Sequence, residues 1–370
     1  MDLHRAAASL VCIGFEGLAA PEPALDLVGQ GVSGAILFRR NIAEPEQVAG
    51  LCASLKRAAG RRFLLSVDQE GGRVARLRDA PFTAVPTMRE IGERGDEALA
   101  RDVGRLLGRE VRAAGFDMDF APVLDVDTNP ANPVIGDRSL SGDPLEVARL
   151  GPALGEGLES VGVASCGKHF PGHGDTSQDS HLTLPRLLHE RSRLREIELV
   201  PFAAWARAGL AAVMTAHVVF EAVEPGLPAT FSERVQTGLL RGELGFRGVS
   251  VSDDLEMRAI ADNYAMEEAA VRSVLAGVDL LLVCHRADRQ QACIDGIARE
   301  AERSAAFRER VLASSRRVER LLARFAAPAR APKESLAALA TEEHRALARR
   351  VACAGKLVAL RDPTEPQRQG

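Results

Sequence analysis

Eight short, almost continuously apolar runs recur along this chain of 370 residues, and segments with helical periodicity separate several of them. Strands that are buried on both faces have this character, which is typical of parallel sheets. Eight parallel strands close a barrel, so the chain is predicted to have an α/β fold of the (β/α)₈ TIM type. The alternative is an open, doubly wound sheet. The expected strands are Val11–Gly14, Gly34–Phe38, Phe63–Val67, Met118–Val123, Val161–Cys166, Ala211–Thr215, Val249–Ser252 and Val278–Val283.

Two other segments place apolar residues on one face of a helix. The first runs from Leu99 to Val111, and Gly115 is expected to end it. The second runs from Phe307 to Phe325. Both patterns favour amphipathic helices packed around the predicted barrel.

Polar side chains with catalytic potential follow five different predicted strands. In a barrel, such residues gather at the carboxyl ends of many strands, whereas an open sheet concentrates them near one switch point. Their distribution therefore favours the barrel. The residues are Asp68, Asp125, Arg138, Lys168, His169, His217 and Asp253.

The densest group of titratable residues lies between Lys168 and His181, in the run Lys-His-Phe-Pro-Gly-His-Gly-Asp-Thr-Ser-Gln-Asp-Ser-His. Phe170 is its only large apolar side chain, so the run is expected to be a loop outside the core. Its proline and two glycines disfavour a helix and allow sharp turns. A polar loop after a buried strand is where an α/β enzyme places its chemistry.

Asp179 and His181 within this loop form a candidate acid/base pair. Residues two apart in an extended chain point the same way, so Asp179 could accept a hydrogen bond from one imidazole nitrogen of His181. A carboxylate partner raises histidine basicity and fixes its tautomer. The pair is therefore predicted to give and take a proton near neutral pH.

Two further groups of carboxylates follow buried strands. Asp253 and Asp254 are adjacent, and one of them could be a nucleophile while the other caps the next helix or binds a neighbouring base. A helix cap fits Asp254 better. In the run from Asp68 to Arg76, two adjacent glycines bring the backbone close to another group, and the two charged ends could grip hydroxyl or carbonyl groups.

In these motifs the chain resembles glycoside hydrolase family 3 enzymes of the β-N-acetylglucosaminidase type. The resemblance covers about residues 8–325 and rests on four motifs in the expected order. The most specific is Lys168–His181, because most other members of the family lack its Asp-Ser-His ending. The motifs are Asp68–Arg76, Asp137–Ser139, Lys168–His181 and Ser252–Met257.

The resemblance implies a retaining, exo-acting glycosidase. Asp253 would be the nucleophile that forms a covalent glycosyl-enzyme, and His181, with Asp179 as its partner, would be the acid/base. The implied substrate is a muropeptide of cell-wall recycling, N-acetylglucosamine β-1,4-linked to 1,6-anhydro-N-acetylmuramic acid. The residues that would hold the hydroxyls and the N-acetyl group are Asp68, Arg76, Arg138, Lys168 and His169.

Composition narrows the partners. A net charge of −4 and a pI near 6.1 argue against a broad nucleic-acid surface, and no apolar run reaches the length of a membrane span. The N-terminus lacks the pattern of a signal peptide, and the six cysteines are scattered without CxxC spacing. We therefore expect a cytoplasmic protein with reduced, buried thiols. The resemblance implies a small carbohydrate or muropeptide as its partner, and the oligomeric state, monomer or weak dimer, is left open. No cofactor and no metal ion are expected.

The end of the chain is predicted to differ from the rest. We expect a catalytic barrel over 1–325, a linker over 326–335 and an extension over 336–370, with a helix around Leu336–Ala352 and a strand at Leu357–Leu360. The extension resembles the linker helix and first strand of a second, α/β/α domain in longer family members. The hypothesis is a remnant of that domain, packed back on the barrel or used in a contact with another chain.

Three other functions stay open. The first is a phosphorylase of β-N-acetylglucosaminides, or another β-glycosidase, on the same barrel. The second is a non-catalytic amino-sugar sensor. The third is a metal-dependent barrel hydrolase, although the spacing of its candidate ligands matches no known metal motif. Those ligands are His169, His173, His181, His217 and Asp253.

Overall fold

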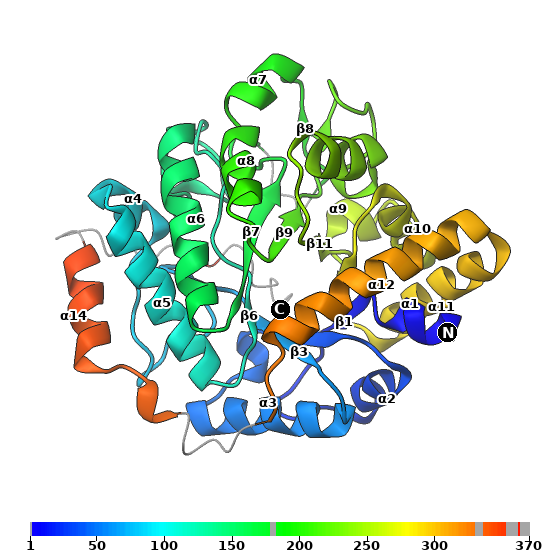
Figure 1. Ribbon diagram of the computed structural model, residues 1–370, viewed down its shortest axis with the longest axis horizontal. Coiled ribbons are helices and arrows are strands. Elements are labelled where there is room, and N and C mark those ends of the chain that lie inside the picture. The colour runs from blue at the N-terminus through cyan, green and yellow to red at the C-terminus, as the bar shows by residue number, and fades with distance from the viewer. Residues whose placement is uncertain (1, 178–182, 330–335, 353–361, 363–370) are drawn as a thin grey trace.

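The computed structural model describes residues 2–177, 183–329, 336–352 and 362. Within these residues, eight parallel strands form a closed barrel in the order β1-β2-β3-β6-β7-β9-β11-β12, with β12 pairing back to β1 (Figure 1). The predicted (β/α)₈ barrel is confirmed. The strands are β1 Val11–Ile13, β2 Gly34–Ile36, β3 Leu64–Val67, β6 Met118–Asp119, β7 Ala164–Phe170, β9 Ala212–Thr215, β11 Val249–Asp254 and β12 Leu280–Val283.

Strand β7 extends further than the sequence suggested. It includes Lys168, His169 and Phe170, and the Phe170 ring is fully buried against Phe202 with ring centroids 5.1 Å apart. The expectation that the run from Lys168 onwards is a loop outside the core was wrong for its first three residues. Hydropathy misjudged Lys168 and His169 because charged side chains can line a barrel interior when carboxylates from other parts of the chain pair with them.

Helices cover the outside of the barrel (Figure 1). The two predicted amphipathic helices are confirmed as α5 and α12, and Asp96 caps α5 by accepting hydrogen bonds from the N–H groups of Ala98 and Leu99. A π-helix, η4, spans Arg234–Glu243. The α-helices described before the extension are α1 Leu3–Ala8, α2 Glu22–Gln30, α3 Pro45–Ala59, α4 Met88–Arg94, α5 Glu97–Ala113, α6 Pro144–Ser160, α7 Arg191–Glu196, α8 Leu199–Arg207, α9 Arg258–Ala261, α10 Met266–Ala276, α11 Ala287–Arg303 and α12 Ala305–Phe325.

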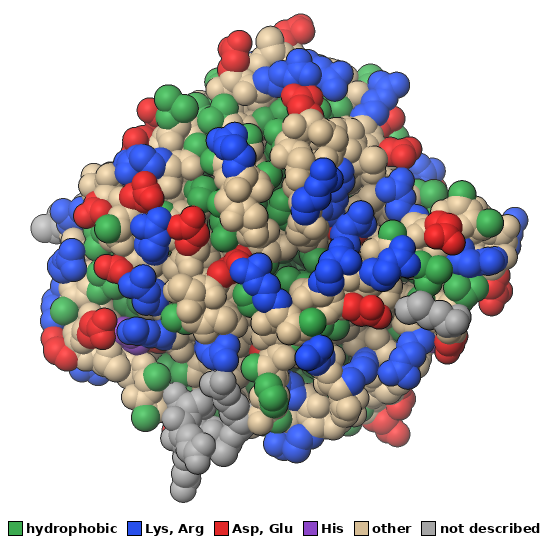
Figure 2. Space-filling model, in the orientation of Figure 1, with side chains coloured by type: hydrophobic (Ala, Val, Ile, Leu, Met, Phe, Trp, Pro, Cys, Tyr) green, Lys and Arg blue, Asp and Glu red, His purple; other side chains and the backbone are tan. Residues whose placement is uncertain are grey.

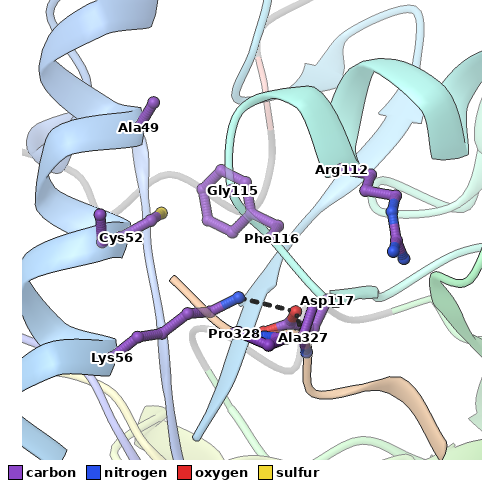
Figure 3. A pocket seen from close by; sticks show the side chains of 10 residues that line it. Ala49, Cys52, Lys56, Arg112, Gly115, Phe116, Asp117, Ala327 and Pro328 are labelled. Carbon is purple, nitrogen blue, oxygen red and sulfur yellow. Dashed lines mark hydrogen bonds and ion pairs between the residues drawn. The ribbon is translucent and has the colours of Figure 1, made fainter. Parts of the chain in front are cut away.

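A buried carboxylate closes the amino-terminal end of the barrel. Lys56 of α3 donates to Asp117 over 2.8 Å, and the Ala327 backbone N–H donates to the same carboxylate over 3.0 Å (Figure 3). The Leu65 backbone N–H also donates to this carboxylate over 3.0 Å. Burial raises the pKa of Asp117, although Lys56 opposes that rise. Asp117 therefore ties α3, β3 and the segment after α12 together, at the opposite end of the barrel from the candidate site.

The C-terminal extension packs back on the barrel. It contains a short 3₁₀ helix, η5 Leu336–Ala338, and helix α14 Glu342–Val351, which lies beside α4 and α5 at the left of Figure 1. The buried Glu110 of α5 accepts hydrogen bonds from the Ala340 N–H and from His344, each over 2.9 Å. This contact agrees with one of the two arrangements that the remnant hypothesis allows. The division into domains stays a prediction.

The described part of the chain contains neither a membrane-spanning helix nor a disulfide. No helix there has the length and apolar character to cross a bilayer, and five cysteines are buried and free, whereas Cys353 lies outside it. On the face in Figure 2, Lys and Arg side chains are interspersed with Asp and Glu. The expected lack of a nucleic-acid partner stays a prediction.

Candidate active site

The predicted site residues that the structure describes lie at the carboxyl-terminal rim of the barrel. Because all eight strands are parallel, their carboxyl ends meet there. Asp68 directly follows β3, Lys168 and His169 belong to β7, and Asp253 belongs to β11. Asp179 and His181 lie outside the described residues, so their predicted pairing stays a prediction.

Lys168 is the centre of a buried ion-pair network. Its Nζ donates to Asp68 Oδ1 over 2.9 Å and lies 2.7 Å from Glu70 Oε1. Arg138 grips the same Glu70 with two hydrogen bonds, from Nε over 2.9 Å and from Nη2 over 2.8 Å. The structure thus brings together three of the predicted site residues, Asp68, Arg138 and Lys168. It also adds Glu70, which sequence analysis did not name as a site residue.

The network keeps its members charged. Burial alone would raise the pKa of Glu70, but Arg138 and Lys168 outweigh it and hold that pKa well below its usual range. In the same way the pKa of Asp68 is lowered by Lys168 and Arg76. Burial alone would lower the pKa of Lys168, but its carboxylates raise it. At neutral pH the site therefore presents fixed cationic donors and fixed anionic acceptors, which suit the hydroxyl groups of a sugar.

A small hairpin brings Arg76 to the same site. Strand β4 Gln69–Gly71 pairs with β5 Val74–Ala75, and Gly71 turns the chain with a φ of 97°, a conformation that favours glycine. Arg76 Nη2 then lies 3.2 Å from Asp68 Oδ2, and the Arg76 side chain is fully buried. The two charged ends of the run from Asp68 to Arg76 therefore lie together in the structure.

Asp125 organises two histidines beside this network. Its carboxylate accepts a hydrogen bond from the His173 backbone N–H over 2.7 Å, and it pairs with His169 Nδ1 over the same distance. Burial lowers the pKa of His173 to about 4, and the charge of His169 adds to that effect, so His173 is neutral at pH 7. The next residue, Gly174, has to be a glycine, because a Cβ at this position would lie 1.8 Å from the Val126 carbonyl oxygen.

Asp254 has a structural role at the end of β11. Its carboxylate accepts hydrogen bonds from the N–H groups of Glu256 and Cys284 over 3.0 and 3.2 Å, and it pairs with His285 over 3.1 Å. Of the two roles left open for the second aspartate, binding a base is present. The expected helix cap was wrong, because the N-cap of α9 is Met257 and Asp254 accepts from backbone N–H groups outside that helix. His217 Nε2 lies 3.0 Å from the Asp254 carbonyl oxygen and can donate to it.

Asp253, like Asp254, is partly exposed at the end of β11. Its Oδ1 accepts a hydrogen bond from the Asp254 N–H over 2.8 Å. Its negative charge helps to raise the pKa of Cys166 in β7, and it opposes the lowering of the pKa of His173, which follows β7. The contacts of Asp254 and His217 fix the backbone that carries Asp253. The Asp254 carboxylate is engaged in these contacts, and the nucleophile role of Asp253 stays a prediction.

Asp119 at the end of β6 gives a prediction about pH. Burial raises its pKa well above the usual value, more than the Gln69 N–H and Lys168 lower it. When the pKa of a carboxyl group is raised by folding, that group makes the folded protein less stable as pH rises above the unfolded pKa, which is about 3.9. Asp119→Asn should therefore unfold at a higher temperature than wild type at pH 7, and the difference should shrink toward zero near pH 4. A difference that is constant between pH 4 and pH 7, measured by thermal unfolding, would contradict this.

The histidines that could have bound a metal have other contacts. Among the residues that the structure describes, no three His, Cys, Asp or Glu side chains converge as potential ligands. His169 pairs with Asp125, and His217 pairs with Thr230 over 2.8 Å. His181 lies outside the described residues.

Comparisons with known proteins identify the family. The Glycosyl hydrolase family 3 N terminal domain matches residues 13–321. A Beta-hexosaminidase from Neisseria meningitidis serogroup B is 45% identical over 269 residues, which cover 71% of this chain and 74% of that protein. The chain therefore belongs to glycoside hydrolase family 3, as the resemblance predicted, and it is a glycoside hydrolase.

Solved structures agree with this assignment. The glycoside hydrolase family 3 beta-N-acetylglucosaminidase from Paenibacillus sp. str. FPU-7 superposes with a TM-score of 0.87 at 44% identity, covering 95% of this chain and 68% of that chain. NagZ from Neisseria gonorrhoeae in complex with N-trifluoroacetyl-D-glucosamine superposes with a TM-score of 0.76 at 34% identity, covering 92% of this chain and 96% of that chain.

Proposed function

We propose that this chain is a retaining exo-β-N-acetylglucosaminidase that removes terminal β-linked N-acetylglucosamine from muropeptides. The observation that carries the proposal is the buried network around Lys168, which lies on the same barrel rim as Asp253. The names of the Neisseria and Paenibacillus proteins support the choice of an N-acetylated β-hexosaminide. Muropeptides as the substrate follow from the family resemblance.

The proposed reaction has two displacements at the anomeric carbon. Asp253 attacks this carbon from the face opposite the leaving group and forms a glycosyl ester, while His181 gives its proton to the departing oxygen. Neutral His181 then takes a proton from water, which displaces Asp253 and restores the β configuration. Asp179 holds His181 in the correct tautomer through both steps.

The proposed sugar contacts follow from the fixed charges of the site. Lys168 and Arg138 have only N–H donors, so they recognise hydroxyl oxygens as acceptors. Asp68 is anionic and accepts from a hydroxyl hydrogen. Arg76 and His169 complete the proposed set of contacts. Because these charges are already in place before the substrate binds, little reorganisation is needed in the reaction.

If His181 is the acid/base, the loss of kcat/KM in a His181 variant should depend on how good the leaving group of the substrate is. For His181→Ala, kcat/KM on N-acetylglucosaminyl-1,6-anhydro-N-acetylmuramic acid should fall about 10²–10⁴-fold, since an alkoxide needs a proton to leave. On p-nitrophenyl N-acetyl-β-glucosaminide, whose leaving group is a good one, kcat/KM should fall much less. Asp179→Ala should follow the same pattern with smaller losses. Steady-state kinetics on the two substrates measures both effects.

A matched control is available close by. His189 pairs with Asp175 over 2.6 Å, so His189→Ala also removes a histidine from an aspartate partner. It should leave both kcat/KM values within about threefold of wild type, because it lies outside the proposed machinery. Equal losses on the two substrates for His181→Ala would contradict the acid/base role. Wild-type turnover of the matching β-glucoside, or none of the acetamido sugar, would contradict the proposed substrate.

A further inference from the structure

Asp362, in the C-terminal extension, contacts the candidate sugar site. Its carboxylate forms an ion pair with Arg76 Nη1, although the two residues are 286 positions apart in the sequence. The side chains of Arg76 and Asp362 are 0% and 2% exposed, so this contact is deeply buried. Arg76 is one of the residues proposed to hold the substrate, and its Nη2 faces Asp68. Asp362 is therefore in direct contact with a residue that is proposed to bind the substrate.

The position of helix α14 is compatible with this reach. Arg94 donates to the carbonyl oxygens of Val351 and Ala352 over 3.0 and 2.7 Å, which anchors the end of α14 against α4. Ten residue steps separate Ala352 from Asp362. An extended chain of that length spans up to about 35 Å, so it can cross from the flank of a barrel to its rim.

Among the directly paired groups of the described residues, Asp362 makes the number of negative charges equal to the number of positive ones. Arg76, Arg138 and Lys168 supply three positive charges in this network, whereas Asp68 and Glu70 supply two negative ones. Asp362 supplies the third, and its charge also contributes to raising the pKa of Arg138. Asp362 places a second carboxylate beside the buried Arg76 guanidinium, on the side away from Asp68, and a buried charge is stabilised by such close, opposite charges.

We propose that Asp362 is a positioning residue of the sugar site. It holds the Arg76 guanidinium from one side while Asp68 holds it from the other, so that Arg76 meets the substrate in a single orientation. This inference rests on the proposed function, because Arg76 is taken to bind the sugar. It also places one determinant of substrate affinity outside residues 13–321, the part of the chain that matches the family domain.

Kinetics of the full-length chain test the proposal. Asp362→Ala should raise KM for p-nitrophenyl N-acetyl-β-glucosaminide about five- to tenfold and leave kcat within about twofold, since the loss of a charge-assisted contact loosens Arg76 without touching the reacting atoms. Asp362→Asn, which keeps the shape and loses the charge, should raise KM by a smaller factor. Acetate at high concentration should restore the KM of Asp362→Ala in part, because a free carboxylate can take the vacated place.

Controls and opposing outcomes separate this inference from its alternatives. Glu343→Ala changes an exposed carboxylate on α14 and should leave KM and its response to acetate unchanged. An unchanged KM in both Asp362 variants would overturn the inference. A lower KM would also overturn it, since that result identifies Asp362 as an occupant that competes with the sugar. Thermal unfolding checks that each variant is folded.

A failure of the proposed function is distinguishable from a failure of this inference. If wild type turns over no substrate, the proposed function is wrong, and calorimetric binding of N-acetylglucosamine then tests Asp362 by itself. Weaker binding to Asp362→Ala than to wild type would support the positioning role. Equal binding, or no binding to either protein, would overturn it.

Discussion

Asp253→Ala is expected to reduce kcat for N-acetyl-β-glucosaminide hydrolysis by at least about 10³-fold, with KM changed far less. The reason is that Asp253 forms a bond to the anomeric carbon only on the way to the glycosyl-enzyme, so its loss raises the barrier without removing ground-state contacts. The neighbouring Asp254 cannot substitute for it, because its carboxylate is held by Glu256, Cys284 and His285. Steady-state kinetics with p-nitrophenyl N-acetyl-β-glucosaminide measures the loss.

Added azide gives this variant a distinctive product. A small anion can enter the space that the carboxylate leaves and attack from the same face, so Asp253→Ala with azide should yield the α-glycosyl azide. Asp262→Ala, which removes an exposed aspartate shortly after β11, is the matched control and should behave like wild type. More than a tenth of wild-type activity in Asp253→Ala, or a β-azide product, would contradict the nucleophile role.

Glu70→Ala is expected to have the largest effect on stability. It leaves Arg138 and Lys168 buried with one carboxylate fewer, and removing one member of a buried ion-pair network costs about 3–5 kcal/mol of unfolding free energy. Urea unfolding measures this loss. Glu97→Ala on α5 removes a carboxylate from a half-exposed pair with Arg101 and should cost less than about 1 kcal/mol. Equal losses of unfolding free energy in the two variants would contradict the role of Glu70 in stabilising the buried Arg138 and Lys168.

The pH dependence of the Glu70 effect has a definite sign. Because the pKa of Glu70 is lowered in the folded protein, its contribution to stability is present above the unfolded pKa, about 4.3, and is lost as pH falls through the folded one. The stability difference between wild type and Glu70→Gln should therefore be largest near neutral pH and shrink as pH falls below 4. A difference that grows on acidification would contradict the pKa direction.

The barrel and its rim were predictable because they depend on local patterns. Strands buried on both faces must be apolar along their length, so β9 and β12 can be recognised without any knowledge of their neighbours. Parallel strands also end at one rim, so Asp68, Lys168 and Asp253 could be assigned to a common site from their positions after apolar runs.

The parts that sequence reasoning missed depend on long-range partners. The polar start of the Lys168 run hid the continuation of β7, because the carboxylates that neutralise it come from residues about 100 positions away. Glu70 had a signal that was not used: Asp68 and Glu70 are two apart in an extended segment, so both can face Lys168. Asp362 had none, since nothing near it in the sequence indicates a contact with Arg76.

The most direct test of the account is to identify the residue that carries the covalent intermediate. The protein would be incubated with a 5-fluoro glycosyl fluoride of N-acetylglucosamine, which slows the second displacement, and digested for peptide mass mapping. The account predicts one added sugar on the peptide that contains Asp253, and none when Asp253→Ala is treated in the same way. A sugar bound to another residue, or turnover through a pathway that inverts the anomeric configuration, would contradict it.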